Sequence, residues 1–233
     1  MVVDRTQLVV GNDTLRLCQS PAAVSVYINE QAFVALNAKL GCVIPISQAL
    51  RANQGDFLTV SGIVTAAPGT FRSDNLYMQD ATAGIQIFGL PGGLGLEVGD
   101  SIEVSGTFSP FRTEAELVSP RVSSNVKKGV GAPDPRDLTT GDVGALTPTS
   151  SSIGRLVRVS GVTVGAFASG NATIDDGSGP SLLRLDGNVA STVPQSTFQA
   201  GTCYSLVGVV GIFDNTPQLK IRGPADVAQV TCP

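Results

Sequence analysis

The sequence lacks the residue type that most often carries acid–base and metal chemistry near neutral pH. Its 233 residues include no histidine, which is the commonest general base and metal ligand in that range. A Ser-His-Asp or Cys-His nucleophile and a Cys/His zinc site are therefore excluded for this chain. Carboxylate pairs are present, but none has a spacing that implies general acid and base roles. We expect no enzyme, no cofactor and no metal site.

The cysteines are the other candidates for chemistry, and they are far apart: Cys18, Cys42, Cys203 and Cys232. No two of them have the spacing of a zinc or redox pair. The local pairing, Cys18 with Cys42 and Cys203 with Cys232, closes the shortest loops and would pin each end of the chain. Such disulfides predict a secreted or cell-surface protein, and buried free thiols are the alternative. The first residues do not form a signal peptide, so if the protein is exported, we expect this sequence to be the mature form, from which a signal peptide has been removed.

The charge of the chain gives little support for binding phosphate polymers. Fifteen Lys and Arg stand against nineteen Asp and Glu, which gives a formal net charge of −4. Nucleic acids are held mainly by Lys and Arg that displace counterions, so only a local basic stripe would suit them. Charged residues make up 15% of the chain, against about 25% in ordinary soluble domains. We therefore expect copies of the protein or a partner to cover part of the surface. No stretch reaches the roughly 18 apolar residues that span a bilayer.

Short strands must position any functional residues, because apolar residues alternate with polar ones over most of the chain. Residues 57–111 form blocks rich in Val, Ile, Phe and Thr, separated by Gly and Asp. This period of two predicts strands with one buried face. Asp80 to Gly84 reads as a hairpin connection, in which Gly84 is expected to take a positive φ.

The second half of the chain repeats the first. Three sets of residues recur in the same order: Val60-Ser61-Gly62 at Val159-Ser160-Gly161 (offset 99), Asp80 and Gly84 at Asp175 and Gly179 (offset 95), and Gly99 and Gly106 at Gly201 and Gly208 (offset 102). Nearly constant offsets indicate a duplicated domain. We predict an N-terminal β-rich extension at 1–44, a first barrel at 45–124, a linker at 125–148 and a second barrel at 149–233. Within the extension, 31–40 fits either a short helix or a strand.

The order of the blocks resembles a known family. In the first unit, the resemblance rests on four segments: 46–50 (ISQAL), 58–64 (LTVSGIV), 77–85 (YMQDATAGI) and 98–106 (VGDSIEVSG). In the second unit, it rests on three segments: 156–161 (LVRVSG), 175–179 (DDGSG) and 218–227 (QLKIRGPADV). These segments resemble the OB-fold domains of secreted bacterial proteins, which often sit beside extracellular nuclease or phosphatase domains. The resemblance implies an all-β chain of two tandem OB-fold-like five-stranded barrels that acts as an accessory module.

An OB barrel that binds polymers uses the face of its second and third strands and the loops beside it. In the first unit this points to Phe71, Arg72, Tyr77, Gln79, Phe88, Phe111 and Arg112. Aromatic side chains stack on bases or sugars, and Arg neutralises phosphate. The alternative is that Phe88 fills the barrel and the others are ordinary surface.

The second unit offers fewer candidates. Only Arg184 remains on the matching face, with Lys220, Arg222 and Phe213 nearby. The acidic pair at 175–176 reads as a solvated hairpin turn, because too few carboxylates lie there for calcium.

Two functions from different classes remain. The first is a non-catalytic extracellular structural or interaction protein, for example a subunit of a self-assembling surface filament. The low charge, the expected disulfides and the unmatched N-terminal strands, which could pair with a neighbouring copy or another surface protein, favour it. The second is an accessory module that binds single-stranded nucleic acid or a glycan beside a secreted hydrolase. The family resemblance and the aromatic residues of the first unit favour it.

Overall fold

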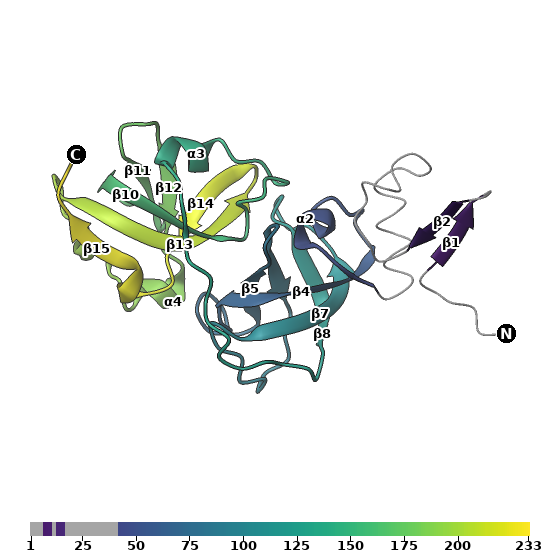
Figure 1. Ribbon diagram of the computed structural model, residues 1–233. Coiled ribbons are helices and arrows are strands. Elements are labelled where there is room, and N and C mark those ends of the chain that lie inside the picture. Colours follow the sequence, from purple (N-terminus) through teal and green to yellow (C-terminus); the bar gives the residue numbers. More distant parts are fainter. Residues whose placement is uncertain (1–6, 11–12, 17–41) are drawn as a thin grey trace.

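The structure, a computed structural model, describes residues 7–10, 13–16 and 42–233. Two small β-barrels lie side by side and follow one another in the chain (Figure 1). Cys18 and the predicted helix or strand at 31–40 lie outside the described residues. None of the described helices is long and apolar enough to cross a membrane.

The first barrel closes on itself through five strands. In the order in which they pair, these are β4 (Phe57–Ala66), β5 (Asn75–Gln79), β6 (Gly84–Phe88), β8 (Glu116–Val122) and β7 (Ser101–Phe108), which returns to β4. All pairs are antiparallel except β6 with β8. Numbered along the chain, the order is 1-2-3-5-4-1, that of an OB-fold barrel. The short strand β3 (Val43–Ile44) adds to β4 in parallel, and the one-turn helix α2 (Ile46–Ala49) follows it.

The second barrel has the same topology. Its strands pair in the order β10 (Leu156–Val164), β11 (Asn171–Asp175), β12 (Ser181–Arg184), β14 (Thr216–Lys220) and β13 (Cys203–Phe213), which returns to β10. Here too only the third and fifth strands, β12 and β14, are parallel within the barrel. The prediction of two tandem five-stranded OB-fold barrels in an all-β chain is therefore confirmed.

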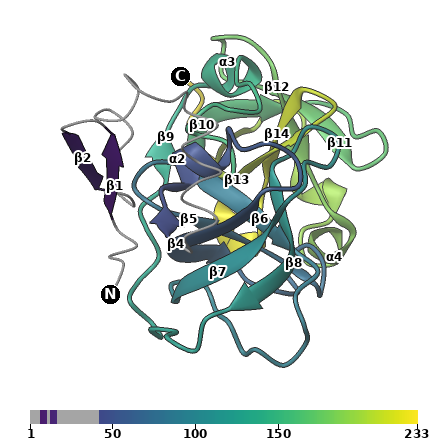
Figure 2. The ribbon, with the colours of Figure 1, turned by 90° about the vertical axis from the view of Figure 1, so that its right-hand side faces the viewer.

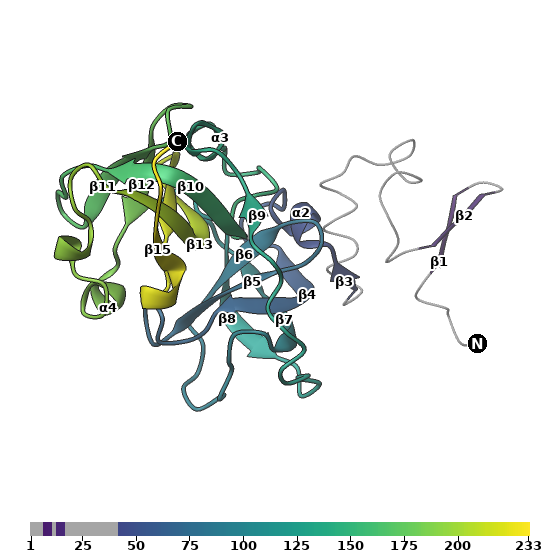
Figure 3. The ribbon, with the colours of Figure 1, turned by 60° about the vertical axis from the view of Figure 1, so that its left-hand side comes forward.

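Smaller elements extend the two barrels. The chain between them contains β9 (Arg136–Asp137), which pairs in parallel with β10, and α3 (Thr140–Gly144). After β12 come α4 (Gly187–Ala190) and a 3-10 turn at Gln195–Thr197. A second 3-10 turn at Pro224–Asp226 leads into β15 (Val227–Val230), which lies along β13 near the C-terminus (Figure 3). The N-terminal strands β1 (Gln7–Val10) and β2 (Asp13–Arg16) pair only with each other among the described strands.

The period-two pattern places the cores. In β7, Ile102 and Val104 are buried in the first barrel, while Glu103 between them is partly exposed. In β10, Val157 and Val159 fill the second barrel in the same way. Each such side chain, fully removed from water, stabilises the fold by roughly 1.5–3 kcal/mol.

Each barrel anchors a short helix in the same way. In the first barrel, Ile46 N at the start of α2 donates a hydrogen bond of 2.8 Å to Asp80 Oδ2 on the β5–β6 hairpin. In the second, Thr140 N at the start of α3 donates one of 3.1 Å to Asp176 Oδ2 on the β11–β12 hairpin. A carboxylate at this position satisfies backbone donors that have no partner within the helix. The structural equivalent of Asp80 is therefore Asp176, one residue beyond the Asp175 that the sequence offset indicated.

Asp176 accepts further hydrogen bonds from the residues around it. Its Oδ1 accepts hydrogen bonds from Thr140 Oγ1 at 2.8 Å and from the backbone and hydroxyl groups of Ser178. These donors lower its pKa to about 2 although partial burial opposes them. Over the part of the chain that the structure describes, no group of three or more Cys, Asp or Glu is placed to hold a metal ion.

Replacing Asp176 with alanine is expected to destabilise the second barrel by about 3 kcal/mol, because several donors lose a charged acceptor at once. In the natural protein the stabilisation by Asp176 is present above the unfolded pKa, near 3.8, and is lost as the pH falls towards about 2. Urea unfolding at neutral pH measures the first effect, with the exposed Asp134→Ala as the control. Equal unfolding midpoints for the two variants would contradict it.

The disulfide predicted for the C-terminal end is confirmed. Cys203 at the start of β13 is bonded to Cys232, with an S–S distance of 2.07 Å and 29 residues of separation. Cys42 also belongs to a disulfide, and its predicted partner, Cys18, lies outside the described residues. None of the cysteines that the structure describes is a free thiol.

Candidate binding groove between the barrels

The outward face of β5 and β6 in the first barrel is covered by the second barrel. Tyr77 and Gln79 point outward from β5, because Leu76 and Met78 beside them fill the first barrel. Tyr77 is fully buried and packs with the core residues of the second barrel, together with Phe71 from the loop before β5. Seen along the molecule, the strands of the first barrel lie directly in front of β13 and β14 (Figure 2). Phe71, Tyr77 and Gln79, which the sequence marked as ligand contacts, therefore join the barrels and have no access to solvent.

Backbone groups of each barrel are hydrogen-bonded by side chains of the other. Leu156 N donates to Gln79 Oε1 at 2.8 Å, and Arg222 Nη1 donates to the Thr65 carbonyl at 2.8 Å. Arg222 is itself held by Asp226 through bonds of 2.6 and 2.8 Å. These bonds fix the orientation of one barrel on the other, because buried backbone groups need partners.

Two glycines allow the closest approach of the barrels. Gly84 N donates to the Ile153 carbonyl at 3.2 Å, and a Cβ added at Gly84 would lie 2.1 Å from the carbonyl carbon of Gly154. The expectation of a positive φ at Gly84 is wrong, because Gly84 is not among the residues with that conformation. Glycine is needed here for contact between two backbones and not for a turn.

A polar cluster lies in the middle of the interface. Tyr77 Oη donates to Glu114 Oε1 at 2.6 Å and accepts from Lys220 Nζ at 3.1 Å. Lys220 Nζ also lies 4.5 Å from the centre of the Phe71 ring and 3.1 Å from Asp186 Oδ2. Burial, followed by the charge of Glu114, raises the pKa of Tyr77 well above its usual range. The tyrosine therefore remains a neutral donor to Glu114.

Two glutamates differ in their surroundings: Glu114 on the β7–β8 loop and Glu116 at the start of β8. Burial raises the pKa of Glu114, while Lys220 and Tyr77 oppose the rise. Burial and the neighbouring Glu114 together raise the pKa of Glu116 to about 7. Glu116 Oε1 accepts a hydrogen bond of 2.7 Å from Gln86 Nε2. Glu116 thus changes its protonation near neutral pH.

A cavity of about 240 Å³ opens beside this cluster on the second barrel. The residues that line it come from β11, β12, the loop after β12, β13, β14 and one loop of the first barrel: Asn171, Arg184, Asp186, Gly211, Ile212, Phe213, Gln218, Lys220 and Glu114. Most of the lining is therefore supplied by β13 and β14, and the ends of β11 and β12 bring in the face of the second and third strands that an OB barrel offers to ligands. Glu114 closes it from the first barrel, so both barrels form the site.

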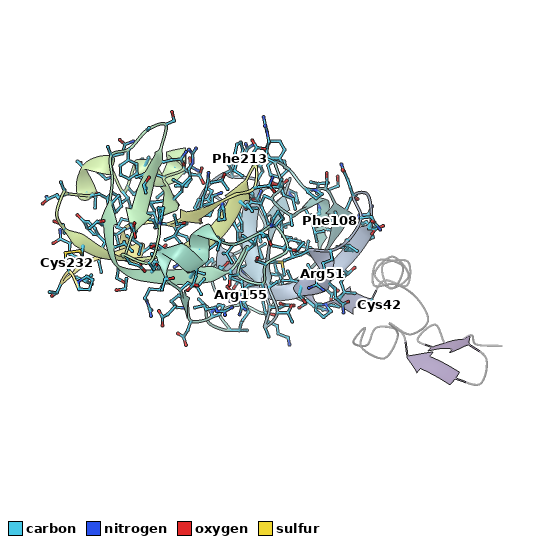
Figure 4. All side chains as sticks on the ribbon, turned by 90° about the horizontal axis from the view of Figure 1, so that it is seen from above. Cys42, Arg51, Phe108, Arg155, Phe213 and Cys232 are labelled. Carbon is cyan, nitrogen blue, oxygen red and sulfur yellow. A yellow bond between two sulfur atoms is a disulfide. The ribbon has the colours of Figure 1, made fainter. Side chains whose placement is uncertain are left out.

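Exposed aromatic and basic side chains form the rim of the cavity. Phe213 is 46% exposed and Phe111 is 60% exposed, and Phe213 lies near the middle of the molecule, where the barrels meet (Figure 4). The guanidinium of Arg112 lies 5.5 Å from the centre of the Phe213 ring and forms an ion pair of 3.0 Å with Asp214. Arg112, predicted as a ligand contact, is thus placed beside the cavity by its contact with Phe213, and Phe111, also predicted, is the exposed residue that precedes it.

The remaining predicted contacts, Arg72 and Phe88, form a separate pair on the first barrel. The Arg72 guanidinium lies 5.2 Å from the centre of the Phe88 ring and is ion-paired with Asp74 at 3.1 Å. Phe88 points outward from β6 and does not fill the barrel, since Ile85 and Ile87 do so.

A second hollow, of about 600 Å³, lies on the first barrel along β4 and β7. Serines, Glu103 and Lys127 line it, and no aromatic side chain does. It lacks the flat apolar surface that the first cavity has in Phe213.

The cavity residues that the sequence did not mark are polar side chains without a recognisable spacing. Glu114 and Asp186 lie in loops of different barrels, and Asn171 and Gln218 are single polar residues on strands. Of the cavity residues in the second unit, the sequence indicated only Arg184, Lys220 and Phe213. The pairing of the barrels brings all of them together.

Comparison with known proteins assigns no family. No family model and no curated protein matches the chain. Among solved structures, a murine DNA-binding protein bound with double-stranded DNA is 14% identical, covers 75% of this chain and 97% of its own, and has a TM-score of 0.36. The tetrameric p202 HIN2 is 13% identical, and the match covers 76% of this chain and 95% of that one, with a TM-score of 0.35. A replication protein A heterotrimer bound to single-stranded DNA is 12% identical, and the match covers 81% of this chain and 69% of that one, with a TM-score of 0.27. Likenesses at this level assign no ligand to this chain.

Proposed function

We propose that this protein is a non-catalytic binding module that holds an extended polymer, a glycan or a single-stranded nucleic acid, across the groove between its barrels. The observation that carries this proposal is the cavity on the second barrel, whose lining includes Asn171 on β11, Arg184 on β12 and Phe213 at the β13–β14 turn. OB barrels offer the face of the second and third strands and the loop between the fourth and fifth strands to both classes of polymer. The exposed Phe213 borders that cavity and offers a flat surface for a base or a sugar ring.

The two barrels act as one unit in this proposal. The face of the first barrel is occupied by Phe71, Tyr77 and Gln79 in the interface, so its contribution to the groove comes from the loop that carries Phe111, Arg112 and Glu114. Fixed elements on both sides keep the groove in one shape, which lowers the cost of ordering on binding. The disulfide between Cys203 and Cys232 suits a module that works in an oxidising compartment.

The Phe213→Ala substitution is expected to weaken polymer binding by about tenfold or more, because one stacked ring contributes roughly 1–3 kcal/mol. Isothermal titration calorimetry with neutral hexasaccharides and with oligothymidylate measures the effect. Phe57→Ala is the matched control, since Phe57 on β4 is also 46% exposed but does not line the cavity. Binding that is equally strong in both variants, or absent in the natural protein for both classes of polymer, would refute the proposed function.

A second candidate function is self-association through the N-terminal strands, as in a surface filament. The observation that favours it is the β1–β2 hairpin, which pairs with no other strand that the structure describes. A two-stranded hairpin is marginally stable alone, and its edges expose backbone groups that another copy can pair with. Removing residues 1–41, with Cys42→Ser, is expected to leave both barrels folded and abolish any assembly. Sedimentation velocity and electron microscopy test this, and assemblies that persist would contradict it.

A further inference from the structure

We propose that the cavity between the barrels binds a neutral sugar unit, so that the polymer recognised by the module is a glycan and not a nucleic acid. This inference rests on the proposed function and names its ligand class.

The first step is the charge of the cavity. Two acidic side chains, Glu114 and Asp186, and two basic ones, Arg184 and Lys220, line it. Arg184 Nε lies 3.2 Å and Lys220 Nζ lies 3.1 Å from carboxylate oxygens of Asp186. The basic groups are therefore already neutralised within the site.

The same pairing holds around the groove. Arg112 on the rim is ion-paired with Asp214 at 3.0 Å. A nucleic acid is held by Lys and Arg that replace the counterions of its phosphates. Each cation here would have to leave a protein carboxylate first, so this groove is poorly suited to a polyanion.

The second step is the hydrogen-bonding chemistry of the lining. Sugar hydroxyls donate and accept at once, and they need donors and acceptors side by side. Asn171 and Gln218 each supply both, and Arg184 and Lys220 donate. Asp186 also lines the cavity, and its partly exposed carboxylate holds the donors Arg184 and Lys220 beside these amides through ion pairs of 3.2 and 3.1 Å.

The third step is size and shape. At about 240 Å³ the cavity is smaller than the sites of roughly 300–1,000 Å³ that hold drug-sized molecules, so a single sugar ring suits it better than a base with its phosphates. Phe213 at its edge offers an aromatic face to the C–H side of a ring.

The Asp186→Asn substitution separates the two ligand classes, because it keeps the shape of the side chain and removes one negative charge. For neutral hexasaccharides of glucose, mannose, galactose and N-acetylglucosamine we expect binding to the natural protein that hardly changes between about 50 and 500 mM NaCl. Asp186→Asn should weaken this binding at least tenfold, since the charge that holds the donors Arg184 and Lys220 in place is lost. Asp137→Asn is the control, because Asp137 forms an exposed ion pair with Arg158 away from the cavity. Circular dichroism and urea unfolding confirm that both variants fold.

Three other outcomes would contradict the inference, and they can be told apart. If oligothymidylate binds in a salt-sensitive way and Asp186→Asn strengthens its binding, the inference is overturned while the proposed function stands. If a hexasaccharide binds and is affected by Phe213→Ala but not by Asp186→Asn, the cavity is not the sugar site and the inference also fails. If neither class of polymer binds, both the inference and the proposed function fail.

Discussion

Replacing Gly84 with alanine is expected to separate the two barrels. The added Cβ would lie 2.1 Å from both the carbonyl carbon and oxygen of Gly154 and 2.6 Å from Arg155 N. All three atoms belong to the backbone, so no side-chain rotation can relieve the overlap. The interface around Tyr77 must open or shift, and we expect a loss of about 3 kcal/mol, the upper end for overpacked sites.

Urea unfolding followed by circular dichroism measures this loss, and small-angle scattering reports the distance between the barrels. Gly92→Ala is the matched control, because Gly92 has no atom within 4 Å of an added Cβ and no positive φ. Its stability should stay within about 0.5 kcal/mol of the natural protein, as at most surface sites. If Gly84→Ala lowered the free energy of unfolding no more than Gly92→Ala does, the two barrels would not approach each other as described.

The Gly84→Ala substitution also tests whether the cavity depends on both barrels. Glu114, on the β7–β8 loop of the first barrel, forms one wall of a cavity whose other residues belong to the second. Opening the interface removes that wall and the hydrogen bond from Tyr77 that holds it. Polymer binding should therefore fall in Gly84→Ala even if each barrel remains folded, as shown by two separate unfolding transitions.

The barrels themselves were predictable from the sequence because their determinants are local. A strand alternates its side chains between two faces, so the sequence pattern alone predicts that Ile102 and Val104 are buried and that Glu103 between them is more exposed. The duplication was visible because equivalent strands keep a glycine where another backbone comes close, as Gly106 and Gly208 do. The one-residue error at Asp175 arose because two aspartates are adjacent there, and only the structure shows that Asp176, the first residue after β11, corresponds to Asp80, the first residue after β5.

The site was only partly predictable because it depends on how the barrels pack. Tyr77 and Gln79 lie on the face that a single OB barrel offers to ligands, but in this chain the second barrel covers that face. No local sequence pattern predicts that the second barrel packs on this face. Gly84 was the one available signal: a glycine within a strand often marks a close backbone approach. Glu114 and Asp186 have no such signal, since they meet across the interface and not along the sequence.

The pH dependence of stability should be governed by Glu116. Its folded-state pKa of about 7 lies above the ordinary value of 4.5, so the folded protein keeps a proton that the unfolded chain releases. The free energy of unfolding is then highest below pH 4.5, falls as the pH rises towards 7, and levels off above it. The fall attributable to this one buried carboxyl group is about 3 kcal/mol. Glu114 changes stability in the same direction, because its pKa is also raised by burial.

Glu116→Gln is expected to remove most of that fall. A glutamine at 116 keeps an oxygen that accepts the 2.7 Å hydrogen bond from Gln86, but it has no charge to bury. The variant should therefore be more stable than the natural protein by about 2–3 kcal/mol at pH 8 and nearly equal to it at pH 4.5. Urea unfolding at both pH values measures this difference, with Glu103→Gln on β7 as the control. A constant difference across this range would mean that Glu116 is already ionised when the barrels fold, and that the cost of burying its charge is offset by Gln86 and Lys220.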